Sequence, residues 1–246
     1  MVTKAKDYGD TATLEKPLTY EKNTSDSEKR KLKHMMLKVN RGSYNFVKRT
    51  IDIVGGSIGC LFLLPIAGVI KIANLASGDK APILLTQKRI GKGGKEFKFY
   101  KFRSMVPNAD EELKRLMATD PAIKEEYTKN KKLKHDPRIT PVGKVIRRTS
   151  IDELPQLINV VKGDMSIVGN RPYLPREKED MGKYYNSIIK TTPGITGYWQ
   201  ISGRSDVSFE KRLELEKYYS HNYSLNMDAK ILSKTIGAVI GSKGAK

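Results

Sequence analysis

The longest charge-free stretch of the chain covers residues 53–70 (IVGGSIGCLFLLPIAGVI). A straight helix of that length would be about 27 Å long, close to the thickness of the hydrocarbon core of a bilayer. A proline removes a helical hydrogen bond and clashes with the preceding turn, so the stretch predicts a bend between Leu61 and Pro65. Basic residues lie on both flanks, and such residues mark the cytoplasmic side of a membrane. We therefore predict a re-entrant membrane helix and its flank over 48–80, with a buried helix of a soluble protein as the alternative.

Two segments of different character precede this stretch. Residues 1–30 show no apolar period and predict a flexible polar tail instead of a signal peptide, which requires an apolar core. Residues 31–47 form a basic segment with apolar residues at helical spacing, namely Leu32, Met35, Met36 and Val39. This amphipathic pattern fits a membrane surface and an ordinary surface helix equally well.

The remainder, residues 81–246, has shorter elements that we assign to a catalytic domain. Two strand-like runs, PILLTQKR and KEFKFYKFR, flank the glycine-rich residues 91–94 and predict a β-hairpin. Helices are predicted from Asn108 as N-cap and from Ser150 as N-cap, the latter with Glu153 at its third position. Between them, residues 119–140 are polar and lysine-rich and predict a surface excursion.

Two amphipathic helices are expected to close the chain, over about 206–219 and 228–240. The last one has an apolar side with Lys230 and Lys234 placed to reach lipid headgroups. That side is made of Ile231, Leu232, Thr235, Ile236, Val239 and Ile240. The predicted fold class is α+β: a monotopic membrane protein with a bent re-entrant helix, a small β-hairpin, a cytosolic helical catalytic core and amphipathic interfacial helices.

Composition adds a strong charge to this picture. The 246 residues include 46 Lys and Arg against 27 Asp and Glu, a net charge of +19. Such a charge calls for a polyanionic partner, which is nucleic acid, an anionic membrane surface or a phosphorylated substrate. The single cysteine excludes an internal disulfide framework, and three scattered histidines argue against a zinc site.

Two Asp-Glu pairs, Asp110-Glu111 and Asp152-Glu153, each fall in the first turn of a predicted helix. The helix dipole stabilises acids there, so stability alone explains both pairs. Only the second pair follows two arginines, Arg147 and Arg148. Guanidinium groups beside a helix N-terminus form an anion site. A carboxylate in such a site could attack a bound phosphate or hold the Mg²⁺ that neutralises it.

Six stretches between residues 48 and 240 carry motifs in a fixed order: KRTIDIV (48–54), QKRIG (87–91), FKFYKFRSM (97–105), RRTSIDELPQLINVVKGDMSIVGNRP (147–172), TPGITGYWQISGRSD (192–206) and KYYSHNYSLNMDAKIL (217–232). These stretches resemble, in the same order, those of the bacterial sugar transferases, a family of monotopic phosphoglycosyl transferases that act on polyprenyl phosphate. They cover most of the chain, so the resemblance is specific.

The resemblance implies an enzyme that takes a sugar-1-phosphate from a UDP-sugar, releases UMP and passes the group to undecaprenyl phosphate. It places the protein at the cytoplasmic face of the bacterial inner membrane, with anionic lipid as a further partner. It implies Mg²⁺ as cofactor, Asp152 as both the nucleophile of a covalent phosphosugar intermediate and a metal ligand, and Glu153 as its partner. Other implied catalytic positions are Lys101, Arg147 and Asp228, and implied substrate-binding positions are Arg204, Arg148 and Arg171. The segment YWQISGRSD favours a plain hexose donor, UDP-glucose or UDP-galactose.

Three positions depart from the family's pattern. Leu64 replaces the serine that usually precedes the proline of the re-entrant helix. Asn170 replaces a proline and is expected to loosen its loop, and Glu216 replaces a frequent Asp and is left outside the predicted site.

Two other functions stay open at this point. A nucleic-acid-binding protein fits the charge, but one Trp and six Phe supply few stacking platforms, so nucleic acid is not expected as a partner. A non-catalytic membrane anchor or scaffold would need none of the Arg–Asp–Glu arrangement. The sequence leaves the biosynthetic pathway and a homodimer undetermined.

Overall fold

The computed structural model describes residues 26–203 and 207–240, with side chains from residue 41 to residue 238 in these ranges. The α-helices there are α1 (Asp26–Leu61), α2 (Leu63–Ala76), α3 (Ala109–Thr119), α4 (Pro121–Asn130), α5 (Pro141–Arg148), α6 (Gln156–Lys162), α7 (Lys178–Met181), α8 (Tyr185–Ile188), α9 (Tyr198–Ile201), α10 (Phe209–Asn222) and α11 (Leu225–Ile240). The strands are β1 (Leu84–Ile90), β2 (Glu96–Phe102), β3 (Ser166–Val168) and β4 (Gly194–Thr196), and the 3₁₀ helices are η1 (Lys92–Gly94), η2 (Ile151–Glu153), η3 (Pro175–Glu177) and η4 (Gly182–Tyr184). This mixture of helices and small sheets confirms the α+β class.

The chain divides into two units after Gly42, and the second unit, from Ser43 onward, holds every side chain discussed below. The predicted bend is present, because α1 ends at Leu61 and α2 begins at Leu63. Pro65 cannot donate to the carbonyl of Leu61, and the two helix axes differ by 44°. In the described part of the chain no single helix is long and apolar enough to cross a membrane, whereas Arg41–Leu61 and Leu63–Ala76 together meet that length and composition as a bent pair.

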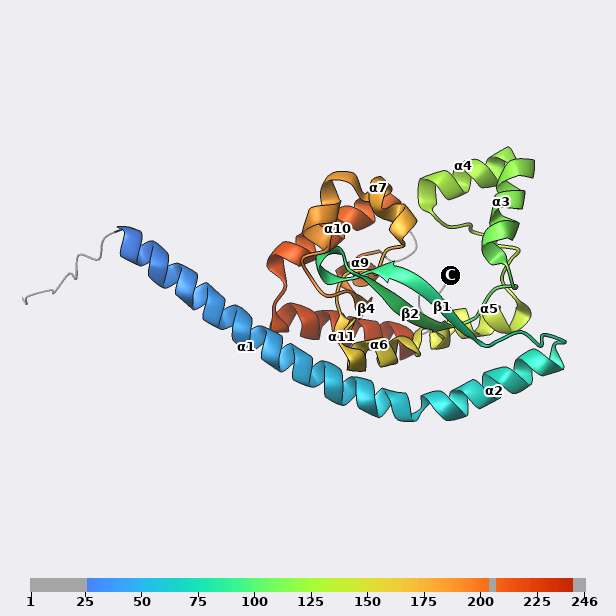
Figure 1. Ribbon diagram of the computed structural model, residues 1–246, viewed down its shortest axis with the longest axis horizontal. Coiled ribbons are helices and arrows are strands. Elements are labelled where there is room, and N and C mark those ends of the chain that lie inside the picture. The colour runs from blue at the N-terminus through green and yellow to red at the C-terminus, as the bar shows by residue number, and fades with distance from the viewer. Residues whose placement is uncertain (1–25, 204–206, 241–246) are drawn as a thin grey trace, which may run out of the picture. The chain divides into compact units, whose positions relative to one another are not determined.

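From Ser43 onward, α1 packs on the protein through polar and small residues. The Arg49 guanidinium donates to the carbonyl oxygens of Val160 and Val161 at 2.6 and 2.7 Å, which satisfies the C-terminal end of α6. The buried Asp52 carboxylate accepts a hydrogen bond from the backbone N–H of Ile167 in β3 at 2.8 Å. Helices α5, α6 and α11 lie on the inner side of the bent pair (Figure 1).

The predicted hairpin is confirmed as the antiparallel pair β1–β2. Its turn contains Gly93 with φ of 70°, a conformation that favours glycine. Directly opposed residues of an antiparallel pair share a face, and side chains alternate along each strand. Arg89 opposes Phe97, so Arg89, Phe99 and Lys101 lie on one face of the hairpin.

A second sheet, which the sequence did not predict, pairs β3 and β4 in parallel. The two strands are only three residues long, too short for an alternation pattern to register. Their approach is close, because a Cβ added to Gly194 would overlap the Gly169 backbone nitrogen, so glycine is required at this crossing. The loop after β3 lies beside the hairpin, since the Ile90 backbone N–H donates to the Tyr173 carbonyl at 2.8 Å.

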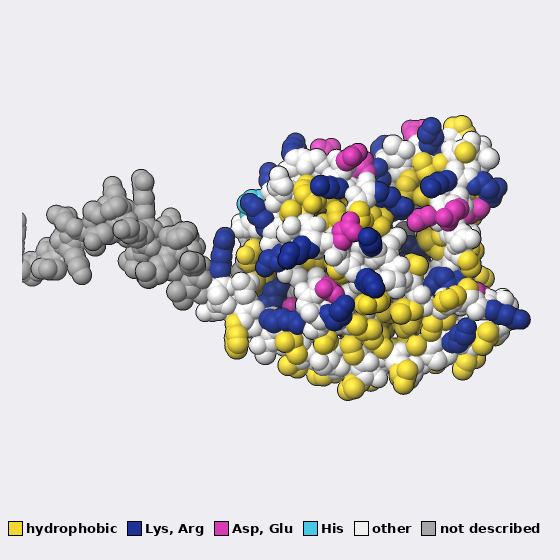
Figure 2. All heavy atoms as spheres, viewed as in Figure 1, with side chains coloured by type: hydrophobic (Ala, Val, Ile, Leu, Met, Phe, Trp, Pro, Cys, Tyr) yellow, Lys and Arg dark blue, Asp and Glu magenta, His cyan; other side chains and the backbone are white. Residues whose placement is uncertain are grey.

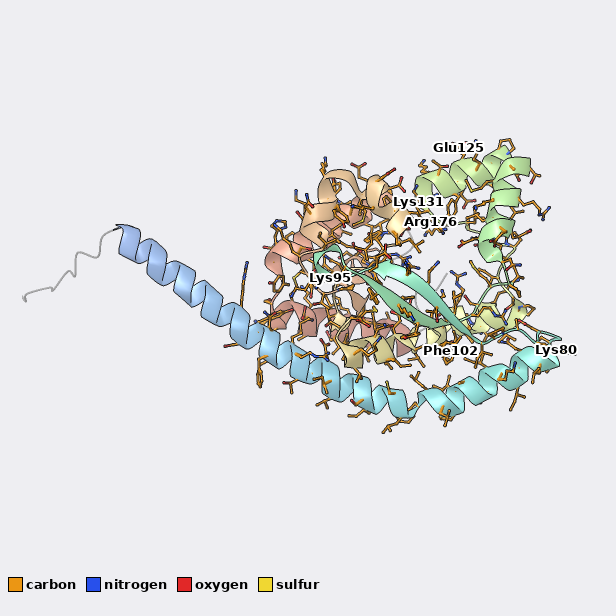
Figure 3. The ribbon with its side chains drawn as sticks, viewed as in Figure 1. Lys80, Lys95, Phe102, Glu125, Lys131 and Arg176 are labelled. Atoms are coloured by element: carbon orange, nitrogen blue, oxygen red, sulfur yellow. The ribbon has the colours of Figure 1, made fainter. Side chains whose placement is uncertain are left out.

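The predicted surface excursion, residues 119–140, contains helix α4, whose N-cap is Asp120. Helices α3 and α4 form an arm that is tied to the segment around α7 by two ion pairs, Lys131–Asp180 at 2.8 Å and Arg176–Asp110 at 3.2 Å. Figure 3 shows Lys131 and Arg176 in the region where α4 comes close to α7. Asn108 precedes α3 as expected, but its backbone is left-handed and its side chain makes no capping hydrogen bond.

The two closing helices are confirmed with shifted ends, as α10 and α11. The apolar side of α11 is only partly available to an interface. Ile231 is fully buried against Val168 and Tyr219, and Thr235 bonds Thr196 at 2.8 Å. Ile236 is 50% exposed, whereas the side chains of Val239 and Ile240 lie outside the described residues. The prediction of an interfacial Ile231 is therefore wrong, because the start of this stripe packs on the core.

Candidate active site

The two carboxylates that the sequence singled out lie in a 3₁₀ turn, η2, and not in the first turn of an α-helix. Ser150 is left-handed with φ of 58° and makes no side-chain capping bond, and α6 begins only at Gln156. The predicted capping box is therefore wrong. Pro155 supplies the reason, since its ring clashes with the carbonyl four residues earlier and it has no N–H to donate. An α-helix can propagate only after this proline. Asp152 therefore does not lie at the N-terminus of an α-helix, and a helix dipole does not create an anion site there.

Asp152 meets a lysine from the hairpin instead. Lys101 Nζ in β2 lies 3.7 Å from Asp152 Oδ2, and the Asp152 side chain is 9% exposed. Arg147, in the last turn of α5, acts on the same carboxylate through its charge. Helix α5 precedes η2 directly, and β2 packs against both η2 and α6. Three separate elements thus bring one carboxylate and two cations together.

Burial sets the protonation of this cluster. It raises the pKa of Asp152, while the charges of Lys101 and Arg147 act in the opposite direction. Burial and the neighbouring Asp152 carboxylate raise the pKa of Glu153 to about 7. Burial lowers the pKa of Lys101, and the Asp152 charge opposes that shift. Burial thus raises the pKa of both adjacent carboxyl groups, and the cations around them oppose that shift.

A pocket opens beside Glu153. Its lining is mostly polar and basic, and it includes Arg89, Lys101, Glu153 and Arg171. Buried nitrogen atoms of Arg147 (Nη1) and Arg171 (Nε) have no hydrogen-bond partner among the described residues. Buried donors without partners are costly, so this arrangement suits an acceptor-rich anionic ligand.

The loop that carries Arg171 is held from one side by α10. The Asn170 amide donates to Ser220 Oγ at 2.7 Å, and the Arg171 backbone N–H donates to Glu216 Oε1 at 3.1 Å. Glu216 is fully buried, and burial raises its pKa to about 7. Asn170 thus ties the loop down, contrary to the expectation that it would loosen it. Glu216, left outside the predicted site, holds the backbone of a predicted substrate-binding residue.

The remaining predicted residues are placed differently. Asp228 is buried in another cluster, where it accepts hydrogen bonds from Tyr44, Tyr219 and Lys48 at 2.8, 2.8 and 2.6 Å. Asp228 does not line the pocket beside Glu153. Arg148 is exposed at the end of α5. Arg204 lies outside the described residues.

Three polar residues of the pocket lining escaped the sequence-based prediction, Arg89, Gln156 and Gln200. The alternation along the hairpin was the available signal for Arg89, since it shares a face with Lys101. No comparable signal marked Gln200, because its place in the lining depends on how α9 packs.

A divalent cation fits the carboxylates of η2 only with help from a ligand. No group of three His, Cys, Asp or Glu side chains that could hold a metal occurs within the described ranges. Mg²⁺ is commonly bound by one or two carboxylates together with substrate phosphates. Glu153 lines the pocket and follows Asp152 directly in η2, so its carboxylate could serve as a second ligand beside Asp152.

Comparisons with known proteins show which family the chain resembles. The family model "Bacterial sugar transferase" matches residues 43–242. The chain is 46% identical over 215 residues to a UDP-galactose-lipid carrier transferase of Erwinia amylovora, covering 86% of this chain and 45% of that protein. It is 44% identical over 203 residues to an undecaprenyl-phosphate galactose phosphotransferase of Salmonella typhimurium, covering 82% and 42%. The chain therefore spans less than half the length of these two relatives. It is 40% identical over 202 residues to the exopolysaccharide production protein ExoY of Sinorhizobium fredii, covering 80% and 87%.

Proposed function

The chain belongs to the bacterial sugar transferase family, and from this premise we propose that it transfers a sugar-1-phosphate from a UDP-sugar to undecaprenyl phosphate. The observation that carries the proposal is the meeting of Asp152 with Lys101 and Arg147 beside a basic pocket. Names of similar proteins, among them an undecaprenyl-phosphate galactose phosphotransferase, support the same chemistry. Exopolysaccharide or capsule synthesis is the process we propose for it, in keeping with the similarity to ExoY.

Asp152 is the proposed nucleophile. Its carboxylate oxygen attacks the β-phosphorus of the donor, the bond from that phosphorus to the bridging oxygen breaks, and UMP leaves. In the second half of the reaction an oxygen of undecaprenyl phosphate attacks the same phosphorus and frees the carboxylate. A covalent intermediate lets a water-soluble donor and a lipid acceptor use one site in turn.

The cations around Asp152 have two proposed tasks. Lys101 and Arg147 keep the carboxylate in its charged, nucleophilic form against the effect of burial. Together with Arg171 they also offset negative charge on the transferring phosphoryl group, which is the main requirement of phosphoryl transfer. Arg147 Nη1 and Arg171 Nε have no hydrogen-bond partner within the described part of the chain, so they are suited to donate to phosphate oxygens.

Mg²⁺ is the proposed cofactor, with Asp152 and Glu153 as its protein ligands. When bound, the ion would neutralise charge on the donor diphosphate. The pKa of Glu153, raised to about 7, makes its availability as a ligand dependent on pH. We therefore expect weaker magnesium binding below neutral pH.

The bent helix pair is the proposed membrane anchor, embedded from the cytoplasmic face. Its outward-facing apolar side chains are between 49% and 83% exposed: Phe46, Ile51, Val54, Ile58, Leu61, Phe62, Leu64, Val69, Ile72 and Leu75. Figure 2 shows hydrophobic atoms gathered along the edge that α1 and α2 form. A continuous exposed apolar surface of this kind is rare on soluble monomers. Lysines near the ends of the pair, such as Lys71, are suited to anionic headgroups.

The donor sugar is proposed to be a plain hexose, UDP-glucose or UDP-galactose. The YWQISGRSD segment motivates this choice, and the galactose named for two relatives agrees with it. A panel of UDP-hexoses and UDP-N-acetylhexosamines tests it through the rate of UMP release. Faster turnover of an N-acetylated donor would contradict the choice.

One assay tests the function as a whole. Detergent-solubilised protein is incubated with UDP-sugar, Mg²⁺ and undecaprenyl phosphate, and UMP release is followed beside the Asp152→Asn variant. We expect acceptor-dependent UMP release by the unaltered protein and none above background by the variant. A protein that releases no UMP from any donor in the panel would refute the proposal.

Extraction of membranes with high salt should leave the protein in the pellet, whereas detergent should release it.

A further inference from the structure

Arg89 is a buried cation of the pocket that the proposed mechanism leaves without a task. Its side chain projects from β1, is 8% exposed and stacks on the Phe99 ring at 5.1 Å from the ring centroid. Nη1 donates to the Pro172 carbonyl at 3.0 Å and Nη2 donates to Gln87 Oε1 at 2.8 Å. Nε has no partner among the described residues, and each Nη carries a second hydrogen. The guanidinium therefore keeps unused donors at the pocket.

The charges of the pocket are unbalanced. Among the described residues, Arg89, Lys101 and Arg171 line it together with a single carboxylate, that of Glu153. None of the ion pairs among the described residues gives Arg89 a carboxylate partner within 4.0 Å. Burial and the neighbouring Arg171 charge lower the pKa of Arg89 to about 9. Two guanidinium groups that line one pocket and repel each other are stabilised when an anion binds between them, and phosphate fits their planar donors.

We propose that Arg89 and Arg171 form a phosphate subsite that both half-reactions use in turn. The subsite first holds the phosphate of the departing UMP and then holds the phosphate of undecaprenyl phosphate. This inference rests on the proposed function, in which Asp152 carries the sugar phosphate between the two steps.

The chemistry of in-line displacement leads to a shared subsite. In the first step the Asp152 oxygen forms a bond to the β-phosphorus, and the opposite bond to the bridging oxygen breaks, so UMP carries away the electron pair. In the second step an acceptor phosphate oxygen forms its bond on that opposite side, and the electron pair of the Asp152 bond returns to the carboxylate. Leaving and entering phosphates therefore occupy the same place relative to Asp152. Arg89 and Arg171 line the pocket next to Glu153, where such a phosphate would sit, and the Nε of each has no hydrogen-bond partner among the described residues.

The first experiment measures binding of UMP by calorimetric titration of the solubilised protein. Arg89→Gln should raise the UMP dissociation constant about 10- to 100-fold, as expected for the loss of charge-assisted hydrogen bonds. Arg115→Gln is the matched control, because Arg115 is exposed and pairs with Glu112 on α3. Melting temperatures check that each variant is folded. If Arg89→Gln does not fold, Arg89→Lys, which keeps the charge and loses the planar fork, serves for the same comparison and should also bind UMP more weakly.

The second experiment separates the half-reactions. Exchange of labelled UMP into UDP-sugar without acceptor reports the first half, and the KM for undecaprenyl phosphate reports the second. Arg89→Gln should raise the KM for UMP and the KM for undecaprenyl phosphate by similar factors. A folded variant with an unchanged UMP dissociation constant would overturn the subsite, and weaker UMP binding with an unchanged acceptor KM would overturn its sharing. If the unaltered protein neither exchanges UMP nor releases it, the proposed function fails, while the titration still decides whether Arg89 binds a phosphate.

Discussion

Replacing Lys101 by methionine should move the acid limb of the pH–rate profile to higher pH by about one to two units. Lys101 favours the charged form of Asp152, and the charged form is the proposed nucleophile. Removal of the positive charge raises the pKa of the carboxyl group. A larger fraction of Asp152 is then protonated at any given acidic pH, so activity falls at a higher pH than in the unaltered protein.

The magnitude follows from the geometry of the pair. At 3.7 Å between Lys101 Nζ and Asp152 Oδ2, two unit charges interact by about 4 kcal/mol at an effective dielectric constant near 20. The Lys101 side chain is 22% exposed, so water screens part of this energy. Arg147 also remains to support the charged carboxylate. Shifts of about one to three units are typical of an opposite charge at such distances, which makes one to two units, or about 1.4–2.7 kcal/mol, a reasonable expectation.

The assay is the initial rate of UMP release between pH 5 and pH 9, fitted for the acid limb. Asp152 and Glu153 interact, so the limb reports their joint titration, and loss of the Lys101 charge should raise both pKa values. Lys98→Met is the matched control, because Lys98 lies on the same strand with an exposed side chain. An acid limb that stays in place or moves to lower pH in Lys101→Met would refute the electrostatic role of this lysine.

Other variants separate chemistry from stability. Asp152→Asn should abolish exchange of UMP into UDP-sugar. Asp110→Asn removes one half-exposed ion pair, so it should lower the free energy of unfolding by at most about 1 kcal/mol in chemical denaturation and keep its activity. The opposite pair of phenotypes would show that the nucleophile is misassigned. Gly143→Ala should destabilise the protein by about 1–3 kcal/mol, because a Cβ there would overlap the backbone carbonyl of Ser104, while Gly68→Ala, with open space around it, should not lower the melting temperature. Asp228→Ala should cost about 3 kcal/mol of unfolding free energy, because it removes the carboxylate partner of the partly buried Lys48 and leaves that lysine only the Val168 carbonyl; an unchanged melting temperature would contradict that structural role.

Helices, bends and turns could be predicted from the sequence wherever a nearby residue, such as a proline or a glycine, determines them. Pro65 interrupts the apolar stretch, and the helix pair bends there. Glycines between two β-prone runs predict a hairpin, and the β1–β2 pair is present. The error at Ser150 was also local, since Pro155 already forbids the helix that was predicted to run through it. A capping pattern should therefore be checked against prolines in the following turn.

The side-chain partners within the site could not be predicted from the sequence, because periodicity reports only which residues share a face of one helix or strand. Lys101 is separated from Asp152 by the whole α3–α4 arm, and only the packing of β2 on η2 brings them to 3.7 Å. Arg89 looks like an exposed hairpin arginine in the sequence, yet the loop at Pro172 and the Phe99 ring bury it.

The sequence by itself determined the bent apolar helix, the hairpin, the closing helices and the acidic pair at Asp152, since each depends on spacing within a few turns or strands. The tertiary structure decided which cations meet that pair and that Asp228 is tied to Lys48 instead. It also decided that Ile231 turns inward, although its helix has the apolar stripe of an interfacial one. The physical reason is that an apolar or charged side chain carries no information on which neighbour will cover it. That choice depends on the packing of elements that are distant in the chain, and packing is a property of the folded molecule as a whole.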